Sequence, residues 1–182
     1  MTSANTVEVN GEQISATHIL IASGVSPAIP DIPGLANAGY LTNETAFELE
    51  ELPDKLIVLG GRFVALETAQ LFARLGSKVT ILQRSQRILP QESPDLTNEL
   101  TRHLVKEGIE VITGVDLKRI YRERDEVLVE AVVNRALETF DGTHILAATG
   151  RQPNSANMGL EEVGIELDSN GFLKVDDYLQ TS

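Results

Sequence analysis

The sequence predicts an α/β fold in which a parallel sheet, alternating with helices, is joined by an antiparallel meander. Three observations support this fold class. Between Leu56 and Ile112, short apolar runs alternate with longer segments of helical periodicity, as in a βαβαβ unit. Between residues 117 and 140 the apolar runs are short and separated by turn residues, as in antiparallel strands. Hydrophobic residues make up 42% of the 182 residues, which is enough to bury a core of ordinary size.

The first part of the chain is predicted to contain a hairpin, a buried strand and a short helix. Valines alternate with polar residues before Asn10-Gly11, which is a favoured two-residue hairpin turn. The continuous apolar run Ile19–Ala22 indicates a buried strand, and the proline-rich segment 26–34 indicates an extended connection after it. The acidic segment 43–52 is predicted to be a short helix that ends before a proline.

The alternating unit consists of three predicted strands and two predicted helices. Gly76 ends the first helix and Glu107-Gly108 ends the second. Because a helix joins each strand to the next, we expect the strands to be parallel, with right-handed crossovers. The elements are strand Leu56–Leu59, helix Arg62–Leu75, strand Val79–Leu82, helix Pro94–Lys106 and strand Ile109–Ile112.

The remaining elements are all predicted strands. Three of them form the meander, a fourth is buried and ends in Thr149-Gly150, and the last two form a hairpin that turns at Asn170-Gly171. They are Leu117–Tyr121, Val127–Val133, Ala136–Phe140, Thr143–Ala148, Ile165–Leu167 and Phe172–Val175.

Charge and composition exclude several classes of function. A net charge of −12 argues against nucleic acid as a partner, because phosphate contacts need clustered Lys and Arg. The chain has no Cys, and its histidines have no second ligand at a useful spacing, so no metal site is expected. The start is polar, and no apolar run approaches the about 20 residues that span a bilayer. We therefore expect a cytoplasmic protein with no membrane partner.

Gly60 and Gly61 lie where the first strand of the alternating unit meets its helix. This order is typical of a Rossmann-like, three-layer nucleotide-binding domain, because the helix N-terminus offers free N–H groups to a pyrophosphate. In the pattern G-x-G-x-x-G/A, Gly60 is the first glycine and Ala65 the small third residue, whereas Arg62 replaces the second glycine. Three roles stay open for Arg62: its side chain crowds the ligand, pairs with a phosphate, or is solvated.

The end of the second strand predicts the choice of nicotinamide cofactor. An acidic residue here would accept the ribose hydroxyls of NAD, but this chain has Gln83, followed by Arg84 and Arg87. No carboxylate repels a 2′-phosphate, and two guanidinium groups are available to bind it. NADPH is therefore the expected cofactor and NADH the alternative. In the competing interpretation, both arginines are solvated on a loop.

Two similar stretches flank the alternating unit. Ile21–Pro27 and Ala147–Pro153 each end an apolar run with a small residue, a hydroxyl residue and a glycine, and a proline follows three residues later. Their repetition indicates two crossings between this domain and a neighbouring one. Together with the glycine loop, these stretches resemble the crossover motifs of the two-dinucleotide-binding flavoprotein disulfide reductases.

The resemblance covers nearly the whole chain and implies a domain organisation. Residues 43–149 would form the NAD(P)H-binding domain. Two partial FAD-domain segments would contribute strands: residues 1–42, which include the crossover, and residues 150–182. The family's flavin-binding glycine motif, redox cysteine pair and dimerisation domain match no part of this chain. We therefore expect a segment that is inactive alone and belongs to a homodimeric parent, while the oligomeric state of the segment stays open.

Within the family, the mercuric reductases are most similar, in the proline-rich segment 26–34 and in segment 64–80. The implied function is the NADPH-binding part of an FAD-dependent oxidoreductase that passes hydride from NADPH to FAD, then electrons through a cysteine pair to Hg(II). Its partners would be the nicotinamide nucleotide and the remainder of the parent flavoprotein, which holds the FAD. The alternatives are dihydrolipoamide dehydrogenase, where Glu is expected in place of Gln83, another disulfide reductase, and a nucleotide-binding module without chemistry.

The resemblance assigns a supporting catalytic role to Glu67, which would lie near the nicotinamide and pair with a flavin-domain lysine. The helix dipole alone would also favour a carboxylate there. Thr149 and Gly150 end the last buried strand, at the sheet edge where ligands bind. The candidate cofactor-binding residues are Gly60, Gly61, Arg62, Phe63, Val64, Glu67, Gln83, Arg84, Arg87, Thr149 and Gly150.

Overall fold

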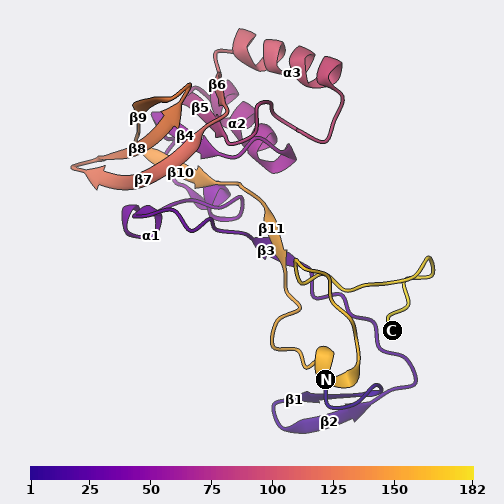
Figure 1. Cartoon of the computed structure of the whole chain (residues 1–182). Helices are drawn as coiled ribbons and strands as arrows, with labels where there is room; N and C mark the ends of the chain where they lie inside the picture. The colour runs from indigo at the N-terminus through magenta and orange to yellow at the C-terminus, as the bar shows by residue number, and fades with distance from the viewer. The chain divides into compact units, whose positions relative to one another are not determined.

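A four-stranded parallel sheet forms the centre of the fold, with strand order β10-β4-β5-β6 (Figure 1). The computed structural model describes residues 1–182. The predicted βαβαβ unit is confirmed, and each of its elements begins and ends within one residue of its predicted bounds. The strands are β4 (Lys55–Leu59), β5 (Lys78–Gln83), β6 (Glu110–Thr113) and β10 (His144–Ala147), and the helices are α2 (Phe63–Leu75) and α3 (Pro94–Lys106).

Local sequence signals explain where the two helices begin and end. Helix α2 ends at Gly76, whose φ of 117° lies in the left-handed region and whose N–H donates to carbonyls of the last turn. Helix α3 begins after Ser93, whose hydroxyl accepts a hydrogen bond from the N–H of Leu96 at 3.4 Å. Pro94 occupies the first turn, where its missing N–H costs nothing.

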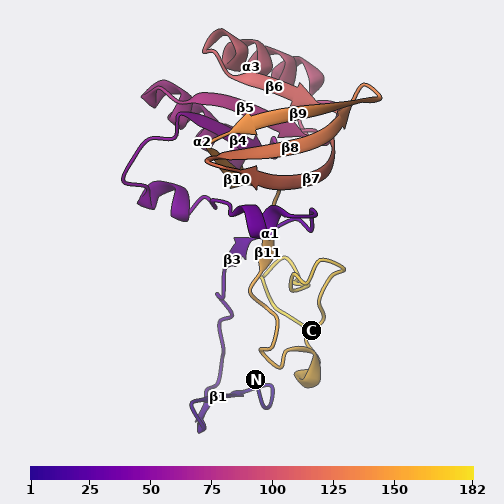
Figure 2. The same cartoon turned by 90° about the vertical axis from the view of Figure 1, so that its left-hand side faces the viewer.

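Strand β4 separates two hydrophobic cores, because its side chains alternate between the two faces of the sheet. Leu56 and Val58 pack with α2 and α3 on one face. Ile57 and Leu59 pack on the other face with the meander, which Figure 2 shows laid over the parallel sheet. The predicted three-layer α/β fold is therefore confirmed. The meander has the strand order β7-β8-β9 and consists of β7 (Asp116–Glu123), β8 (Glu126–Val133) and β9 (Ala136–Gly142).

Residues 27–54, which precede the βαβαβ unit, are part of the same compact unit, which extends from Pro27 to Gly150. Helix α1 (Leu35–Ala38) buries both of its end residues in the core beneath the meander. Just before it, the N–H of Ile120 donates to the Pro33 carbonyl at 2.8 Å. The compact unit thus begins before residue 43, because segment 27–38 packs on the meander. The predicted acidic helix is a single 3₁₀ turn, η1 (Thr45–Glu48).

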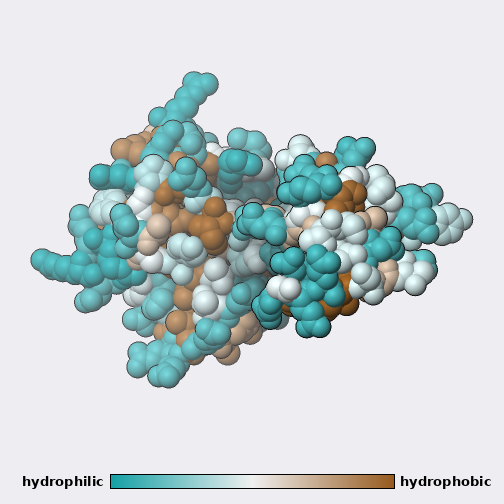
Figure 3. Space-filling view, turned by 90° about the horizontal axis from the view of Figure 1, so that it is seen from below, coloured by the Kyte–Doolittle hydropathy of each residue, from teal (hydrophilic) through white to brown (hydrophobic).

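Met1–Ser26 and Arg151–Ser182 form a second unit with little buried surface. The predicted N-terminal hairpin is confirmed, since Asn10 and Gly11 adopt φ values of 55° and 83° in its turn. Few apolar side chains of this second unit are buried. Figure 3 shows hydrophobic residues among the hydrophilic ones on one face of the molecule. The elements of the second unit are β1 (Thr6–Val9), β2 (Glu12–Ser15), β3 (Val25–Pro27), β11 (Arg151–Pro153) and η2 (Glu161–Val163).

One further prediction for this second unit is wrong and another is confirmed in part. The run Ile19–Ala22 forms no strand, and Leu20 is 89% exposed. The predicted C-terminal hairpin is present in a shortened form, in which Leu167 bridges Leu173 and backbone hydrogen bonds join Asp168 to Phe172 at 2.7 Å and Lys174 to Glu166 at 2.9 Å. An apolar run becomes a buried strand only where a neighbouring strand pairs with its backbone groups, and the sheets of this chain include no partner for residues 19–22.

The longest helices, α2 and α3, have 13 residues each. None of the helices is both long and apolar enough to cross a bilayer.

Candidate functional site

A pocket of about 610 Å³ lies beyond the carboxyl ends of the four parallel strands, within the unit Pro27–Gly150. This is the edge at which open α/β sheets bind ligands, and the volume is in the usual range for a small-molecule site. Segments that follow β4, β5, β6 and β10 all reach it. The lining consists of segments 30–32, 60–62, 82–85, 90–91 and 115–117 and of Thr149.

The two glycines of the loop after β4 are required for different reasons. Gly60 has a φ of 116°, and a Cβ there would lie 2.4 Å from the carbonyl oxygen of Ala148. Its N–H donates to the carbonyl of Leu82 at 3.0 Å, so the turn is fixed to the neighbouring strand. At Gly61 a Cβ would instead lie 3.0 Å from the side chain of Gln83. The loop is therefore held close to both flanking strands, β10 and β5.

The N-terminus of α2 opens directly from this loop. Arg62 is its N-cap residue, and no side chain caps the helix. The first N–H groups of any helix have no intrahelical acceptor, so those of α2 are available to an anion. Ala65, the third residue of the fingerprint, is completely buried against the sheet. Its small side chain lets the helix approach the strand closely, which directs the free N–H groups toward the loop.

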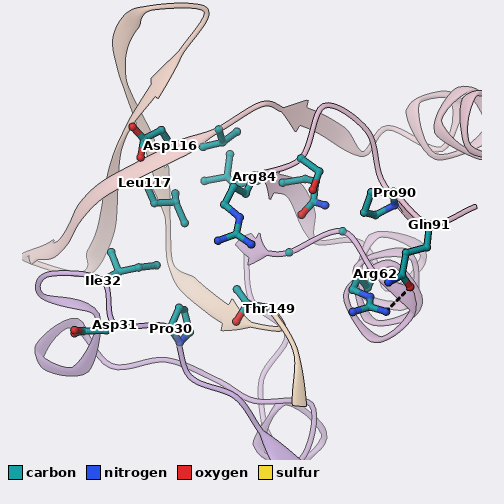
Figure 4. A pocket seen from close by; sticks show the side chains of 16 residues that line it. Pro30, Asp31, Ile32, Arg62, Arg84, Pro90, Gln91, Asp116, Leu117 and Thr149 are labelled. Carbon is teal, nitrogen blue, oxygen red and sulfur yellow. Dashed lines mark hydrogen bonds between the residues drawn. The ribbon is translucent and has the colours of Figure 1, made fainter. Parts of the chain in front are cut away.

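Arg62 lines the pocket and makes one side-chain hydrogen bond, from Nη2 to Oε1 of Gln91 at 2.9 Å. Figure 4 shows this pair at one end of the pocket. The acidic side chains of the lining, Asp31 and Asp116, lie at the opposite end in the same view. Asp116 is paired with Lys118 at 2.5 Å. The pocket therefore has one cationic end, at the N-terminus of α2.

Of the residues predicted to select the cofactor, Arg84 is the one whose guanidinium extends into the middle of the pocket (Figure 4). Gln83 also belongs to the lining, but it is buried, and its amide nitrogen approaches the carbonyl oxygen of Arg87 at 3.5 Å. Arg87 is outside the lining. Its Nη2 donates to the carbonyls of Pro90 and Glu92, at 2.8 and 3.2 Å.

The other predicted residues divide between the pocket and its surroundings. Thr149 lines the pocket, and its hydroxyl donates to the carbonyl of Ala28 at 3.0 Å. Gly150 lies just behind it, and its carbonyl accepts from the N–H of Ala28. Phe63, Val64 and Glu67 lie on the first turns of α2, outside the lining, with Glu67 exposed.

Sequence reasoning missed Gln91 and the acidic end of the pocket. Asp116 begins β7, three residues after the end of β6, so the rule that ligands bind beyond the carboxyl ends of strands would have indicated it. Asp31 was assigned only to an extended connection. Gln91 carries no sequence signal, because its partner Arg62 is 29 residues away and neither residue belongs to a repeated pattern.

Comparisons with known proteins agree with this architecture. A sequence model of the family described as "Pyridine nucleotide-disulphide oxidoreductase" matches residues 1–182. The chain is 39% identical to a mercuric reductase of Bacillus cereus over 178 residues, which are 98% of this chain and 28% of the relative. It is 38% identical to a glutathione reductase of Burkholderia cepacia, covering 98% of this chain and 38% of the relative.

A solved structure is similar over the whole chain. It is the HOCl-induced flavoprotein disulfide reductase RclA from Escherichia coli, with a TM-score of 0.89 and 31% identity, covering 100% of this chain and 41% of that chain. The predicted resemblance to mercuric reductases is confirmed at the level of sequence, although the chain spans only 28% to 38% of the length of the curated relatives that it matches. The chain belongs to the pyridine nucleotide-disulphide oxidoreductase family.

Proposed function

We propose that the unit Pro27–Gly150 binds NADPH and is the nicotinamide-nucleotide domain of an FAD-dependent mercuric reductase. The observation that carries this proposal is the position of Arg84, whose guanidinium extends into a pocket that also contains the free N-terminus of α2. One basic group and one helix terminus match the two separate anionic parts of NADPH, the 2′-phosphate and the diphosphate. When bound, NADPH supplies a hydride for the flavin.

The residues of the glycine loop fit the diphosphate. Gly60 lines the pocket and has no side chain that would cover its backbone there. At the end of β5, Gln83 is neutral, so it neither repels a 2′-phosphate nor offers the carboxylate that accepts the ribose hydroxyls of NAD. Arg87 holds backbone carbonyls, and Arg84 is therefore the main candidate for the 2′-phosphate.

The rest of the proposal concerns the longer protein. The second unit, Met1–Ser26 and Arg151–Ser182, would belong to its FAD domain, and Glu67, exposed on α2, would face the flavin side of the nucleotide. Electrons would then pass to a cysteine pair outside this chain, which has no Cys itself, and from there to Hg(II). The parent would be a homodimer that works in the cytoplasm.

Glutathione reductase is the second candidate for the parent, because the chain is 38% identical to a glutathione reductase and 39% identical to a mercuric reductase. Both candidates predict the same nucleotide site, so the two differ only in the electron acceptor. NADPH oxidation by the parent holoenzyme, measured with Hg(II) and with glutathione disulfide, separates them. A nucleotide-binding module without chemistry would oxidise NADPH with neither.

Calorimetric titration of the chain with NADPH and NADH tests the proposed cofactor. We expect NADPH to bind more tightly, and Arg84→Glu to weaken NADPH binding by about 10- to 100-fold, which is the effect of losing one charge-assisted hydrogen bond. NADH affinity should change little. Arg135→Glu, in the tight turn between β8 and β9, makes the same change in net charge away from the pocket and is the control. Equal losses for the two nucleotides in Arg84→Glu contradict the assignment.

A further inference from the structure

A short segment after β5 contacts the glycine loop at two points. This segment, Arg87–Glu92, is here called the strap. Its backbone N–H at Leu89 donates to the carbonyl of Gly61 at 2.8 Å. Its side chain at Gln91 accepts from the guanidinium of Arg62 at 2.9 Å. The strap thus fixes both the backbone and the side chain of the residue that opens α2.

The contact at Leu89 orients the peptide that joins Gly61 to Arg62. In a trans peptide the C=O and N–H groups point in opposite directions. Because the carbonyl of Gly61 is bound to the strap, the N–H of Arg62 points away from Leu89. The turn is firmly held, since Leu89 is only 5% exposed although its φ is 41°, an uncommon value for a residue with a side chain.

The strap is itself held by Arg87. One guanidinium nitrogen of this residue bridges the carbonyls of Pro90 and Glu92, which flank Gln91 on both sides. Its Nε is buried and has no partner, so the side chain is enclosed by the strap rather than available to a ligand. The backbone on both sides of Gln91 is therefore held in place, and its amide oxygen accepts the hydrogen bond from Arg62.

The side chain that accepts the hydrogen bond from Arg62 decides whether the positive charge of Arg62 remains available to a ligand. A glutamine is neutral, so its amide oxygen orients the guanidinium without cancelling the positive charge. The other N–H groups of the guanidinium stay available for phosphate oxygens, as does the amide NH2 of Gln91. A carboxylate in the same place would form an ion pair and weaken the attraction for phosphate.

We propose that Gln91 is a positioning residue that holds Arg62 as a cationic clamp for the diphosphate of the bound nucleotide, while Arg84 serves the 2′-phosphate. This inference rests on the proposed function, because it assumes that a nucleotide occupies the pocket. Of the three roles left open for Arg62, the proposal assigns phosphate binding. It also assigns a role to Arg87, which positions the strap instead of touching the ligand.

Two simple nucleotides separate the two phosphate positions in a titration of the chain. ADP carries the diphosphate and no 2′-phosphate, whereas adenosine 2′-monophosphate carries only the latter. We expect Arg62→Ala to weaken ADP binding about tenfold, which is the lower end of effects for charge-assisted hydrogen bonds. Gln91→Ala should weaken it less, about threefold, because the guanidinium remains and only its orientation is lost. Gln91→Glu should also weaken ADP binding, and Arg62→Ala should reduce the dependence of affinity on salt.

The double variant shows whether Gln91 acts through Arg62. In the Arg62→Ala background, Gln91→Ala should have no further effect on ADP, and neither variant should change the binding of adenosine 2′-monophosphate. Gln86→Ala is the control, because Gln86 is an exposed glutamine of the same connection outside the pocket lining. Binding of ADP that is unchanged in Gln91→Ala, or weakened equally in both backgrounds, overturns the inference. A wild-type chain that binds neither NADPH nor ADP instead overturns the proposed function, and the inference with it.

Discussion

Replacing Gly60 with alanine tests how the glycine loop after β4 is built. Two effects combine at this position. The φ of 116° is unfavourable for any residue with a side chain, and the new Cβ would lie 2.4 Å from the carbonyl oxygen of Ala148 and 2.9 Å from its carbonyl carbon. Both atoms belong to the backbone, so no side-chain rotation relieves the contact. The loop or the end of β10 must move instead.

The size of the effect follows from these two terms. A non-glycine residue in the left-handed region costs about 1–2 kcal/mol, and overpacking adds about 1–3 kcal/mol, so we expect a loss of about 3 kcal/mol in the free energy of unfolding. For a chain of this size, that corresponds to a decrease in Tm of roughly 6–12 °C. Gly108→Ala is a matched control, because Gly108 has a φ of 86° but a Cβ added there would meet no atom within 4 Å. Its loss should be about 1 kcal/mol, which is the backbone term alone.

Thermal and urea unfolding of the two variants, followed by circular dichroism, provides the measurement. Gly61→Ala gives an intermediate case, because its Cβ would meet only the side chain of Gln83, which can shift. We expect Gly60→Ala to be the least stable of the three variants, and Gly108→Ala to be at least as stable as Gly61→Ala. Equal losses in Gly60→Ala and Gly108→Ala would refute the reasoning, since the contact with Ala148 would then contribute nothing.

Two further predictions concern burial and pH. Ile57→Ala should lower the free energy of unfolding by about 2–5 kcal/mol, because Ile57 is 1% exposed beneath the meander, whereas Leu20→Ala should change it by less than about 0.5 kcal/mol. Equal effects in urea unfolding would contradict this difference in burial. The hydrogen bonds from Arg74 lower the pKa of Glu107 below its ordinary value of 4.5, so this pair stabilises the fold above that pH and the contribution is lost as the pH falls below it. Glu107→Gln should therefore make the midpoint of unfolding less sensitive to pH in this acidic range, and a pH dependence identical to that of the wild type would exclude the pair as a contributor.

The centre of the fold was predictable because its signals are local. Apolar periodicity and the residues at the helix ends, such as Ser93 and Gly76, lie within or next to the elements that they define. The run Ile19–Ala22 has an equally apolar sequence, but it forms no strand, because burial depends on a partner strand that need not be close in the sequence.

In the candidate site, the residues that directly follow strands were predictable, and those placed by the folded loop were not. Gly60 and Arg84 follow strands directly, so their place at the carboxyl edge follows from the order of elements. Arg87 is only three residues further on, yet its side chain turns to the carbonyls of the strap. Gln91 meets Arg62 only through the folded loop. Side-chain direction within irregular segments depends on such tertiary hydrogen bonds, which periodicity does not encode.

The hydrogen bonds of Ala28 join the two ends of the unit Pro27–Gly150. Its N–H donates to the carbonyl of Gly150 and its carbonyl accepts from the hydroxyl of Thr149, both at 3.0 Å, so the chain enters and leaves the unit Pro27–Gly150 at one point. A domain whose ends meet can be inserted into a host, removed or transplanted without stretching either partner. The unit Pro27–Gly150 therefore has the geometry of a domain that can be inserted into another chain, or exchanged, as one piece.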